Sequence, residues 1–406
     1  MRRITEKAWR LISTALALAL PLVSLASGQH ATWSGRPNSG WLYVVDSNRN
    51  TTESTVLVVD PEKGQIAASL RAGFQPDITL SPDGSRLYLS FSDQQNPAEG
   101  KLQVIDTSTG AVLKELPNRN RWLTTDYAYS PNMVLSNDGV WIYLLKMDQS
   151  GAAIEYIEVF DTQLSAFLSN RIALPECVSA IMVPSETGVY AVCGGTQDVR
   201  FVNVDRESKT LRPTSMTIEI GKSLREGTSK PVPYQKYPHY VATGFLNPNA
   251  TFTAITTDGL FVRSDALSGE TIDRGAIDRA THAPSFEPGL PITMGWLQDR
   301  WLRMQTPVVS PDGKRIYLGL GQAKALKHGS QSLDRIVILD PTDFDLISTL
   351  NPHRTFWSFA INSSGNRLYV VDPYQAVVSV LDANNGRELS VISGVGTTPV
   401  YAVVAP

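Results

Sequence analysis

Several acidic, basic and imidazole side chains in this sequence fall where one predicted sheet passes to the next. They are Asp77, Asp126, His239, His353 and Arg354, and the aromatic Phe74 shortly precedes the first of them. Carboxylates and imidazoles act as general acid and base when they converge on one point, and an arginine beside them holds an anionic group. Taken singly, each residue fits a solvated loop or a satisfied core group equally well. Together they predict a polar mouth of a central channel, with one aromatic ring.

Other kinds of reactive site are absent from the sequence. The five histidines are scattered without a pair at ligand spacing, so no metal or covalent haem is predicted on this chain. There is no Gly-x-Ser-x-Gly elbow, phosphate-binding glycine loop or dinucleotide fingerprint. The sequence therefore predicts that this chain carries no cofactor and no catalytic residue of its own, unless the polar mouth is a hydrolase site.

A hairpin repeated at distant positions shows which elements must position these residues. "LSPDGSRLYLSF" begins at Leu80, and "VSPDGKRIYLGL" returns at Val309. The Asp-Gly pair supplies the positive φ of a tight turn between two strands. After it come a third strand ending in an aspartate, such as Asp106, a second turn at Gly110 and a fourth strand. Each unit is thus predicted to be a four-stranded antiparallel sheet.

Six complete units of this kind follow one another, and a seventh is divided between the two parts of the chain that flank them. Residues 40–72 supply its second, third and fourth strands, and residues 397–406 supply its first. Repeats of about 40 residues with four strands each are typical of a β-propeller. We predict an all-β, seven-bladed propeller with four antiparallel strands per blade, whose ring closes when the C-terminal strand pairs with the N-terminal blade.

The first 28 residues are predicted to be a signal peptide. Basic residues precede an apolar stretch from Leu11 to Leu25, which ends at the small residues Ala26-Ser27-Gly28. The stretch is shorter than a membrane span of about 20 residues, although a retained anchor is the alternative. Residues 29–406 would then form the propeller, periplasmic or secreted in a bacterium, without a membrane span after cleavage. The formal net charge of −3 gives no reason to expect nucleic acid as a partner.

Two intervals between repeats are longer than the rest and are expected to be insertions. They cover residues 207–238 and 270–305, and the second contains "PGLPITMGWLQDRWLRM". Insertions in repeat proteins map to loops on one face. Trp296, Trp301 and Met304 therefore either cover a hydrophobic patch of the same chain or dock a partner.

The two cysteines lie on the first two strands of one predicted blade. Cys177 and Cys193 are equally distant from residue 185 in the "PSETG" turn, so a simple hairpin would place them opposite one another. We predict a structural disulfide, with two buried thiols as the alternative. A bulge at Gly188 would shift the register and prevent this pairing.

The repeat resembles YVTN-type propellers of bacterial surface and periplasmic proteins. A more specific resemblance, over most of residues 29–406, is to the heavy subunits of methylamine and aromatic amine dehydrogenases. Four stretches carry it: "AGFQPDITLSPDG" from Ala72, "ECVSAIMVPSETGVYAVC" from Glu176, "MGWLQDRW" from Met294, and the closing repeat from Asn366 to Val400. This resemblance implies that Phe74 lies at a substrate-channel entrance.

The resemblance implies a non-catalytic scaffold. In such enzymes a cysteine-rich light subunit carries tryptophan tryptophylquinone, and electrons pass to a copper protein or cytochrome. This chain, with its two cysteines, would be the heavy subunit. Two alternatives stay open: a stand-alone periplasmic or surface binding module without enzymatic activity, and a lactonase-like hydrolase acting in the channel with Asp77, Asp126, His239 and Arg354.

Overall fold

Tight turns divide the chain into short strands, and all regular elements among the described residues are β-strands. This computed structural model describes residues 40–47, 54–92, 100–118, 133–147, 154–169, 171–174, 179–185, 188–194, 198–205, 210–219, 241–247, 250–256, 260–276, 307–320, 333–342 and 345–406. All belong to one of two units, Trp33–Pro406. The other unit, Met1–Thr32, with the predicted signal peptide, lies outside the described residues. Among the described residues, no helix is long and apolar enough to span a membrane.

The strands form antiparallel sheets that follow one another along the chain, and we number the sheets in that order. Sheet 1 contains β29 (Pro399–Val404), β1 (Leu42–Asp46), β2 (Ser54–Asp60) and β3 (Gln65–Ala72), and sheet 2 contains β4 (Phe74–Leu80), β5 (Arg86–Ser92), β6 (Gly100–Asp106) and β7 (Val112–Asn118). Sheet 3 contains β8 (Met133–Leu135), β9 (Trp141–Met147), β10 (Ile154–Asp161), β11 (Ala166–Phe167) and β12 (Ile172–Ala173). Sheet 4 contains β13 (Ser179–Pro184), β14 (Gly188–Gly194), β15 (Asp198–Asp205) and β16 (Thr210–Glu219), and sheet 5 contains β17 (Val241–Leu246), β18 (Thr251–Thr256), β19 (Leu260–Asp265) and β20 (Thr271–Ala276). Sheet 6 contains β21 (Val308–Val309), β22 (Ile316–Leu320), β23 (Arg335–Leu339) and β24 (Leu346–Leu350), and sheet 7 contains β25 (Ser358–Ile361), β26 (Arg367–Asp372), β27 (Val377–Asp382) and β28 (Glu388–Ser393).

Six of these sheets are regular four-stranded blades, and sheet 3 departs from the pattern. Its β11 and β12 both pair with β10, Phe167 opposite Phe160 and Ala173 opposite Tyr156. The outermost strand is therefore interrupted, because extra residues are accommodated between its two halves. The all-β propeller class is confirmed, whereas the expectation of four strands in each of seven blades is wrong for this sheet.

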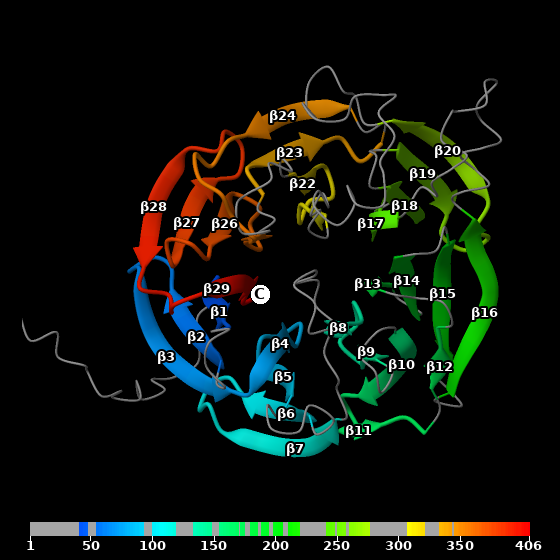
Figure 1. The fold of residues 1–406 in the computed structure, drawn as a ribbon, viewed down its shortest axis with the longest axis horizontal. Helices are drawn as coiled ribbons and strands as arrows, with labels where there is room; N and C mark the ends of the chain where they lie inside the picture. Colours follow the sequence, from blue (N-terminus) through cyan, green and yellow to red (C-terminus); the bar gives the residue numbers. More distant parts are fainter. Residues whose placement is uncertain are drawn as a thin grey trace, which may run out of the picture. The chain divides into compact units, whose positions relative to one another are not determined.

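The sheets follow one another around a ring (Figure 1), and apolar side chains pack between neighbouring sheets. Strands in the middle of a sheet are buried on both faces, as expected for sheets packed between neighbours: Leu42 and Val44 are both 0% exposed. Separate clusters link sheets 1 and 2, 2 and 3, 3 and 4, 5 and 6, 6 and 7, and 7 and 1. Between sheets 4 and 5, the rings of Tyr190 and Phe252 stack with centroids 4.6 Å apart. The ring is thus closed by packing at every junction.

A tyrosine recurs in the second strand of most sheets and ties neighbouring sheets together. Tyr43, Tyr143, Tyr317 and Tyr369 are among the largest fully buried side chains. The Tyr190 hydroxyl donates to the carbonyl oxygen of Ala266 in the next sheet at 2.5 Å, and that of Tyr317 donates to Ala383 at 3.3 Å. At Tyr190 and Tyr317, ring burial is therefore combined with a hydrogen bond across the junction.

Turn aspartates act as the sequence predicts. The Asp106 carboxylate accepts hydrogen bonds from the amides of Ser108 and Thr109, and Gly110 takes a φ of 69°. In the hairpin, Asp83 accepts from the Ser81 hydroxyl at 2.6 Å and the Ser85 amide at 3.0 Å. These bonds, led by that from Ser81, lower the pKa of Asp83 to about 2. The Asp-Gly runs are therefore structural.

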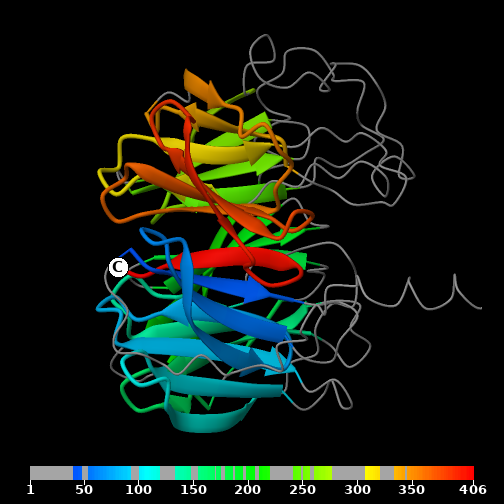
Figure 2. The same ribbon diagram turned by 90° about the vertical axis from the view of Figure 1, so that its left-hand side faces the viewer.

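The C-terminal strand β29 pairs with β1, as predicted (Figure 2). It lies between the cluster shared with sheet 2 and the cluster shared with sheet 7. At its start, the buried Asp46 carboxylate accepts hydrogen bonds from the amides of Thr397 and Thr398 at 3.0 and 2.6 Å. This carboxylate holds the connection from β28 to β29 in place.

We expect Gly396→Ala to lower the free energy of unfolding by about 3 kcal/mol, because two costs combine. Gly396 has a φ of 93°, and a Cβ there would lie 2.2 Å from Cγ of Asp46, which the two threonine amides hold. Urea unfolding measures the loss. The control is Gly394→Ala, where φ is 74° and a Cβ meets nothing within 4 Å, so about 1 kcal/mol of backbone strain is expected. Equal losses in the two variants would contradict the proposed clash.

The expected insertions begin later in the chain than the sequence suggested. Residues 210–219 form β16, and residues 271–276 form β20, each the outermost strand of a sheet. The intervals between repeats show how much extra length is present but do not show where the outer strand ends and the insertion begins. Residues 220–238 and 277–305 lie outside the described residues.

Candidate functional site

Phe74 begins β4, the innermost strand of sheet 2, directly after the crossing from the outer strand β3. Its side chain is partly buried, and it pairs in register with Ser92. Between Phe74 and Asp77 the register shifts by a bulge, since Asp77 pairs with Ser90. A bulge redirects side chains at the end of a strand. Because Ser92 and Ser90 are two residues apart on β5, this bulge pairs Phe74 and Asp77 with positions on the same face of the sheet.

The Asp77 side chain is buried and hydrogen-bonded to the neighbouring inner strand. The hydroxyl of Tyr401 in β29 donates to Oδ1 of Asp77 at 3.1 Å and accepts the amide of Ile78 at 2.7 Å. Burial, and then the Asp77 charge, raise the pKa of Tyr401 well above its ordinary value, so this hydroxyl stays a donor at neutral pH. The Asp77 carboxylate therefore links sheets 1 and 2 through Tyr401 and is not a free acid or base at the channel mouth.

We expect Tyr401→Phe to lower the free energy of unfolding by about 1–3 kcal/mol without changing the fold. The substitution keeps the ring but removes the hydroxyl that bonds both Asp77 and the Ile78 amide, and buried groups that lose a partner carry a desolvation cost. Denaturant unfolding followed by tryptophan fluorescence measures it. Tyr374→Phe is the control, because Tyr374 is half exposed, and an equal effect there would contradict the assignment.

Two further predicted residues, His353 and Arg354, lie in the connection from β24 to β25. His353 is exposed with a φ of 58°, a left-handed conformation that serves the turn. Nη2 of Arg354 lies 2.8 Å from Oε2 of Glu388, which is in β28, the outermost strand of sheet 7. The guanidinium is thus engaged in an ion pair toward the outer strand β28.

The remaining predicted residues of the mouth and of the docking loop cannot be placed. Asp126, His239, Trp296, Trp301 and Met304 lie outside the described residues. Within the described ranges, no group of three or more histidine, cysteine, aspartate or glutamate residues has an arrangement that could hold a metal ion.

The hairpin that carries Cys193 has a different register from the one that the sequence suggested. Cys193 pairs with Ala180, and the turn closes between Ser185 and Gly188, whose amide donates to the Ser185 hydroxyl at 3.0 Å. The centre of the hairpin therefore lies beyond residue 185, so the prediction that Cys177 stands directly opposite Cys193 is wrong. Cys177 itself lies outside the described residues, and the disulfide remains a prediction.

A buried lysine, which the sequence reasoning missed, forms a charged network between sheets 2 and 3. Lys146 at the end of β9 is 1% exposed, and its Nζ lies 3.3 Å from Oε2 of Glu158 and bonds Oδ1 of Asn118. Arg171 pairs with the other oxygen of Glu158 at 3.2 Å, and Asn118 donates to Ser90 at 2.8 Å. Burial, opposed by Glu158, lowers the pKa of Lys146 to about 8. Its partners enclose it, which favours a structural role.

Tyr401 and Glu388 were also missed as partners of the predicted residues. The sequence did carry one signal for Tyr401, since "TPVYAVVAP" was assigned to an inner strand and its one aromatic hydroxyl would need a partner once buried. For Lys146 the signal is a single cation that ends the otherwise apolar run "WIYLLK".

Comparisons with known proteins identify the fold. A scan against protein-family models finds no match, and a search of curated proteins finds none either. Among solved structures, a functionally unknown protein from Desulfotomaculum acetoxidans DSM 771 aligns with a TM-score of 0.63 at 10% identity, over 90% of this chain and 99% of that one. The fold and its neighbours thus define this chain as a β-propeller.

Two other solved structures are similar in fold. A putative 6-phosphogluconolactonase from Bacteroides fragilis NCTC 9343 aligns with a TM-score of 0.51 at 18% identity, over 90% of this chain and 98% of that one. The β-propeller domain of Myceliophteria thermophila Cps50 (Swd1) aligns with a TM-score of 0.50 at 12% identity, over 78% and 85% of the two chains. At these identities the likeness concerns the fold alone.

Proposed function

We propose that this propeller is a non-catalytic scaffold that binds a partner, and specifically the heavy subunit of a quinone-dependent amine dehydrogenase. In this proposal a cysteine-rich light subunit carries tryptophan tryptophylquinone and performs the oxidative deamination. Electrons then pass to a copper protein or a cytochrome. The chain is exported to the periplasm, and sheet 3, with its interrupted outer strand, counts as the seventh blade.

The observation that carries the proposal is that the described charged groups of the predicted mouth are already engaged in structural contacts. Asp77 accepts from the Tyr401 hydroxyl across two sheets, and Arg354 is paired with Glu388. An acid or base committed to such contacts is poorly placed to exchange protons with a substrate. We therefore infer that the catalytic groups acting at the predicted channel mouth belong to another chain.

Phe74 provides the link to the amine dehydrogenase heavy subunits. It stands at the beginning of an innermost strand, and a bulge separates it from the buried Asp77. A partly buried aromatic at this place agrees with the channel-entrance role that the sequence resemblance implies. The predicted docking loop with Trp296, Trp301 and Met304 would then contact the light subunit, through an interface of about 2,000 Å² or more.

Affinity purification of the tagged protein from its native host tests this proposal. We expect a stoichiometric small chain that is rich in cysteine and positive in a redox-cycling quinone stain. Phe74→Ala should then raise KM for the amine more than it lowers kcat, because the residue would guide the substrate without reacting. Recovery of the propeller alone, unstained and monomeric, would contradict the amine dehydrogenase role and favour the stand-alone binding module.

The lactonase-like alternative makes a different prediction. It requires Asp77 and Arg354 to turn toward the channel together with Asp126 and His239. Hydrolysis of sugar lactones by the purified protein, lost in Asp126→Asn and His239→Gln, would establish it. Absence of hydrolysis is expected from the pairings of Asp77 and Arg354.

A further inference from the structure

At three junctions between described sheets, the turn between the first and second strands contacts a proline of the preceding sheet. A Cβ placed on Gly139 of sheet 3 would meet Pro82 of sheet 2 at 2.6 Å, and one on Gly365 of sheet 7 would meet Pro311 of sheet 6 at 3.2 Å. Gly84 of sheet 2 approaches Pro406 of sheet 1 in the same way, at 3.3 Å. Each of these glycines, because it has no Cβ, thus leaves room for a proline ring of the preceding sheet.

The junction between sheets 7 and 1 lacks this contact. Gly40 occupies the glycine position of sheet 1, since its amide donates to the Ala405 carbonyl as that of Gly84 donates to Ser81. A Cβ on Gly40 would meet nothing within 4 Å. The preceding turn carries Ser363 where the turns of sheets 2 and 6 carry Pro82 and Pro311. The space beside the glycine, which a proline fills at the three junctions described above, is therefore unfilled between sheets 7 and 1.

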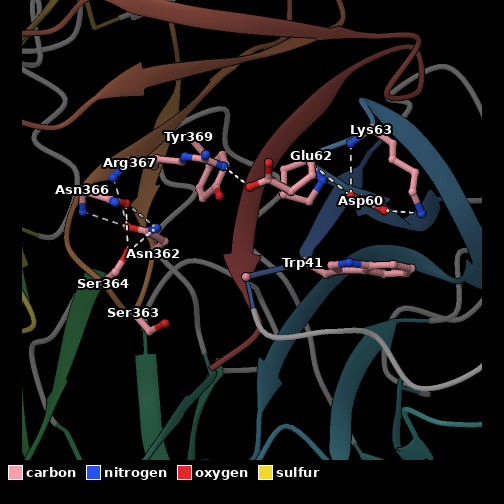
Figure 3. A pocket seen from close by; sticks show the side chains of 12 residues that line it. Trp41, Asp60, Glu62, Lys63, Asn362, Ser363, Ser364, Asn366, Arg367 and Tyr369 are labelled. Atoms are coloured by element: carbon pink, nitrogen blue, oxygen red, sulfur yellow. Dashed lines mark hydrogen bonds and ion pairs between the residues drawn. The ribbon is translucent and has the colours of Figure 1, made fainter.

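A pocket of about 530 Å³ occupies this place. Sheet 1 contributes Trp41 and the turn between β2 and β3, and sheet 7 contributes the turn between β25 and β26 with the beginning of β26 (Figure 3). The polar residues that line it include Asp60, Glu62, Lys63, Asn362, Ser363 and Arg367. The pocket is thus assembled only when the ring closes, from the two ends of the propeller sequence.

Trp41 lines this pocket and is more exposed than its equivalent in sheet 3. The equivalent residue of sheet 3 is Trp141, since Ser136 and Ala405 donate their amides to the carbonyls of Trp141 and Trp41, respectively. Trp141 is only 3% exposed and packs in the cluster between sheets 3 and 4, just as Trp41 packs in part against the cluster between sheets 1 and 2. Trp41 remains partly exposed and lines the pocket. An indole face beside hydrogen-bonding groups is a platform for a ligand with one apolar and one polar face.

Charges in the pocket are already paired with one another. Arg367 forms an ion pair with Glu62 across the junction, and Nζ of Lys63 lies 3.1 Å from Oδ2 of Asp60. A charged or zwitterionic ligand would have to break these pairs, whereas hydroxyl groups can donate to the carboxylates and accept from the cations without doing so. Asn362 and Ser363 add neutral donors and acceptors.

We propose that the pocket between sheets 7 and 1 binds a neutral sugar unit, with the apolar face of the pyranose ring against Trp41 and its hydroxyl groups toward the paired charges. The site lies apart from Phe74 and does not depend on the amine dehydrogenase role. It suits a carbohydrate of the cell envelope or a free saccharide equally well, because both present the same ring.

Isothermal titration of the full-length protein with neutral saccharides tests the proposal. The probes are glucose, galactose, mannose, N-acetylglucosamine and their β-linked disaccharides, with purified peptidoglycan fragments to represent the envelope. We expect at least one saccharide to bind in the high micromolar to millimolar range, and Trp41→Ala to weaken it about tenfold or more. Tyr374→Ala, which removes an exposed aromatic outside the pocket, should leave binding unchanged.

A second variant fills the pocket but keeps Trp41 and the paired charges in place. Ser363→Pro places proline where the Ser-Pro-Asp-Gly turns of sheets 2 and 6 have it, a position at which proline is compatible with the backbone. We expect it to fold normally by circular dichroism and to abolish saccharide binding. Retained binding in Ser363→Pro, no binding of any saccharide by the unmodified protein, or binding of the zwitterion glycine in place of sugars would each overturn the proposal.

Discussion

Ending the chain at Gly396, and so removing β29, is expected to abolish the cooperative unfolding transition. The deleted strand supplies Val400, Ala402 and Ala405 to the clusters on both sides of sheet 1. It also carries Tyr401, the hydrogen-bond partner of the buried Asp77. Without it β1 becomes an open edge whose residues are buried on both faces in the intact ring, and such edges pair with other chains.

Thermal unfolding and light scattering measure this effect. We expect the shortened chain to aggregate and to lack a sharp transition, a loss larger than any single substitution would cause. A circular permutant is the matched control: a short Gly-Ser linker joins Pro406 to Gly40, whose amide already bonds the Ala405 carbonyl at 2.9 Å, and new ends are placed between β5 and β6. The permutant should unfold cooperatively. A soluble, cooperative truncated chain would show that ring closure is dispensable.

Substitution of Lys146 by alanine is expected to cost about 3–5 kcal/mol of stability, because it leaves Glu158 buried with one ion-pair partner fewer. The amide of Asn118 also loses a charged donor. Chemical unfolding at neutral pH measures the loss. The double variant Lys146→Met with Glu158→Leu removes both charges and keeps the volume, so it should recover most of the stability. A double variant as unstable as the single one would show that packing, not charge, dominates.

Stability should also depend on pH through Lys146. Its pKa is about 8 in the folded protein against 10.5 for an unperturbed lysine, so between these values the unfolded chain binds more protons. The free energy of unfolding therefore rises with pH across this window, by roughly 3 kcal/mol relative to Lys146→Met, which does not titrate. If the difference in free energy of unfolding between the unmodified protein and Lys146→Met instead falls with rising pH, the ion pair with Glu158 raises the lysine pKa.

Features of the fold that depend on local chemistry were predictable from the sequence. The hairpins follow from Asp83-Gly84 and its equivalents, and the third-strand turns follow from aspartates such as Asp106, whose carboxylates bond amides two and three residues later. Ring closure was predictable because the first strand missing near residue 40 reappears near residue 399. In each case a few residues within reach of one another determine the geometry.

Features that depend on contacts between sheets were not predictable in this way. The partner of Asp77 lies 324 residues away, and a bulge decides which way the carboxylate faces. The hairpin of Cys193 was misjudged because the turn centre was inferred from residue numbers, whereas the Ser185 hydroxyl bonds the Gly188 amide and fixes another register. The interruption of the outer strand in sheet 3 likewise leaves no mark in the hydrophobic pattern.

Pairing of β29 with β1 also constrains the order in which the ring can fold. β29 follows all the other described strands in the chain, yet it completes sheet 1, which contains the first of them. Sheet 1 therefore keeps one edge unpaired until the last strand reaches it. Contacts so distant in sequence form slowly, and exposed edges invite mispairing in the meantime. Holdase chaperones that cover this edge should accordingly raise the yield of the folded ring.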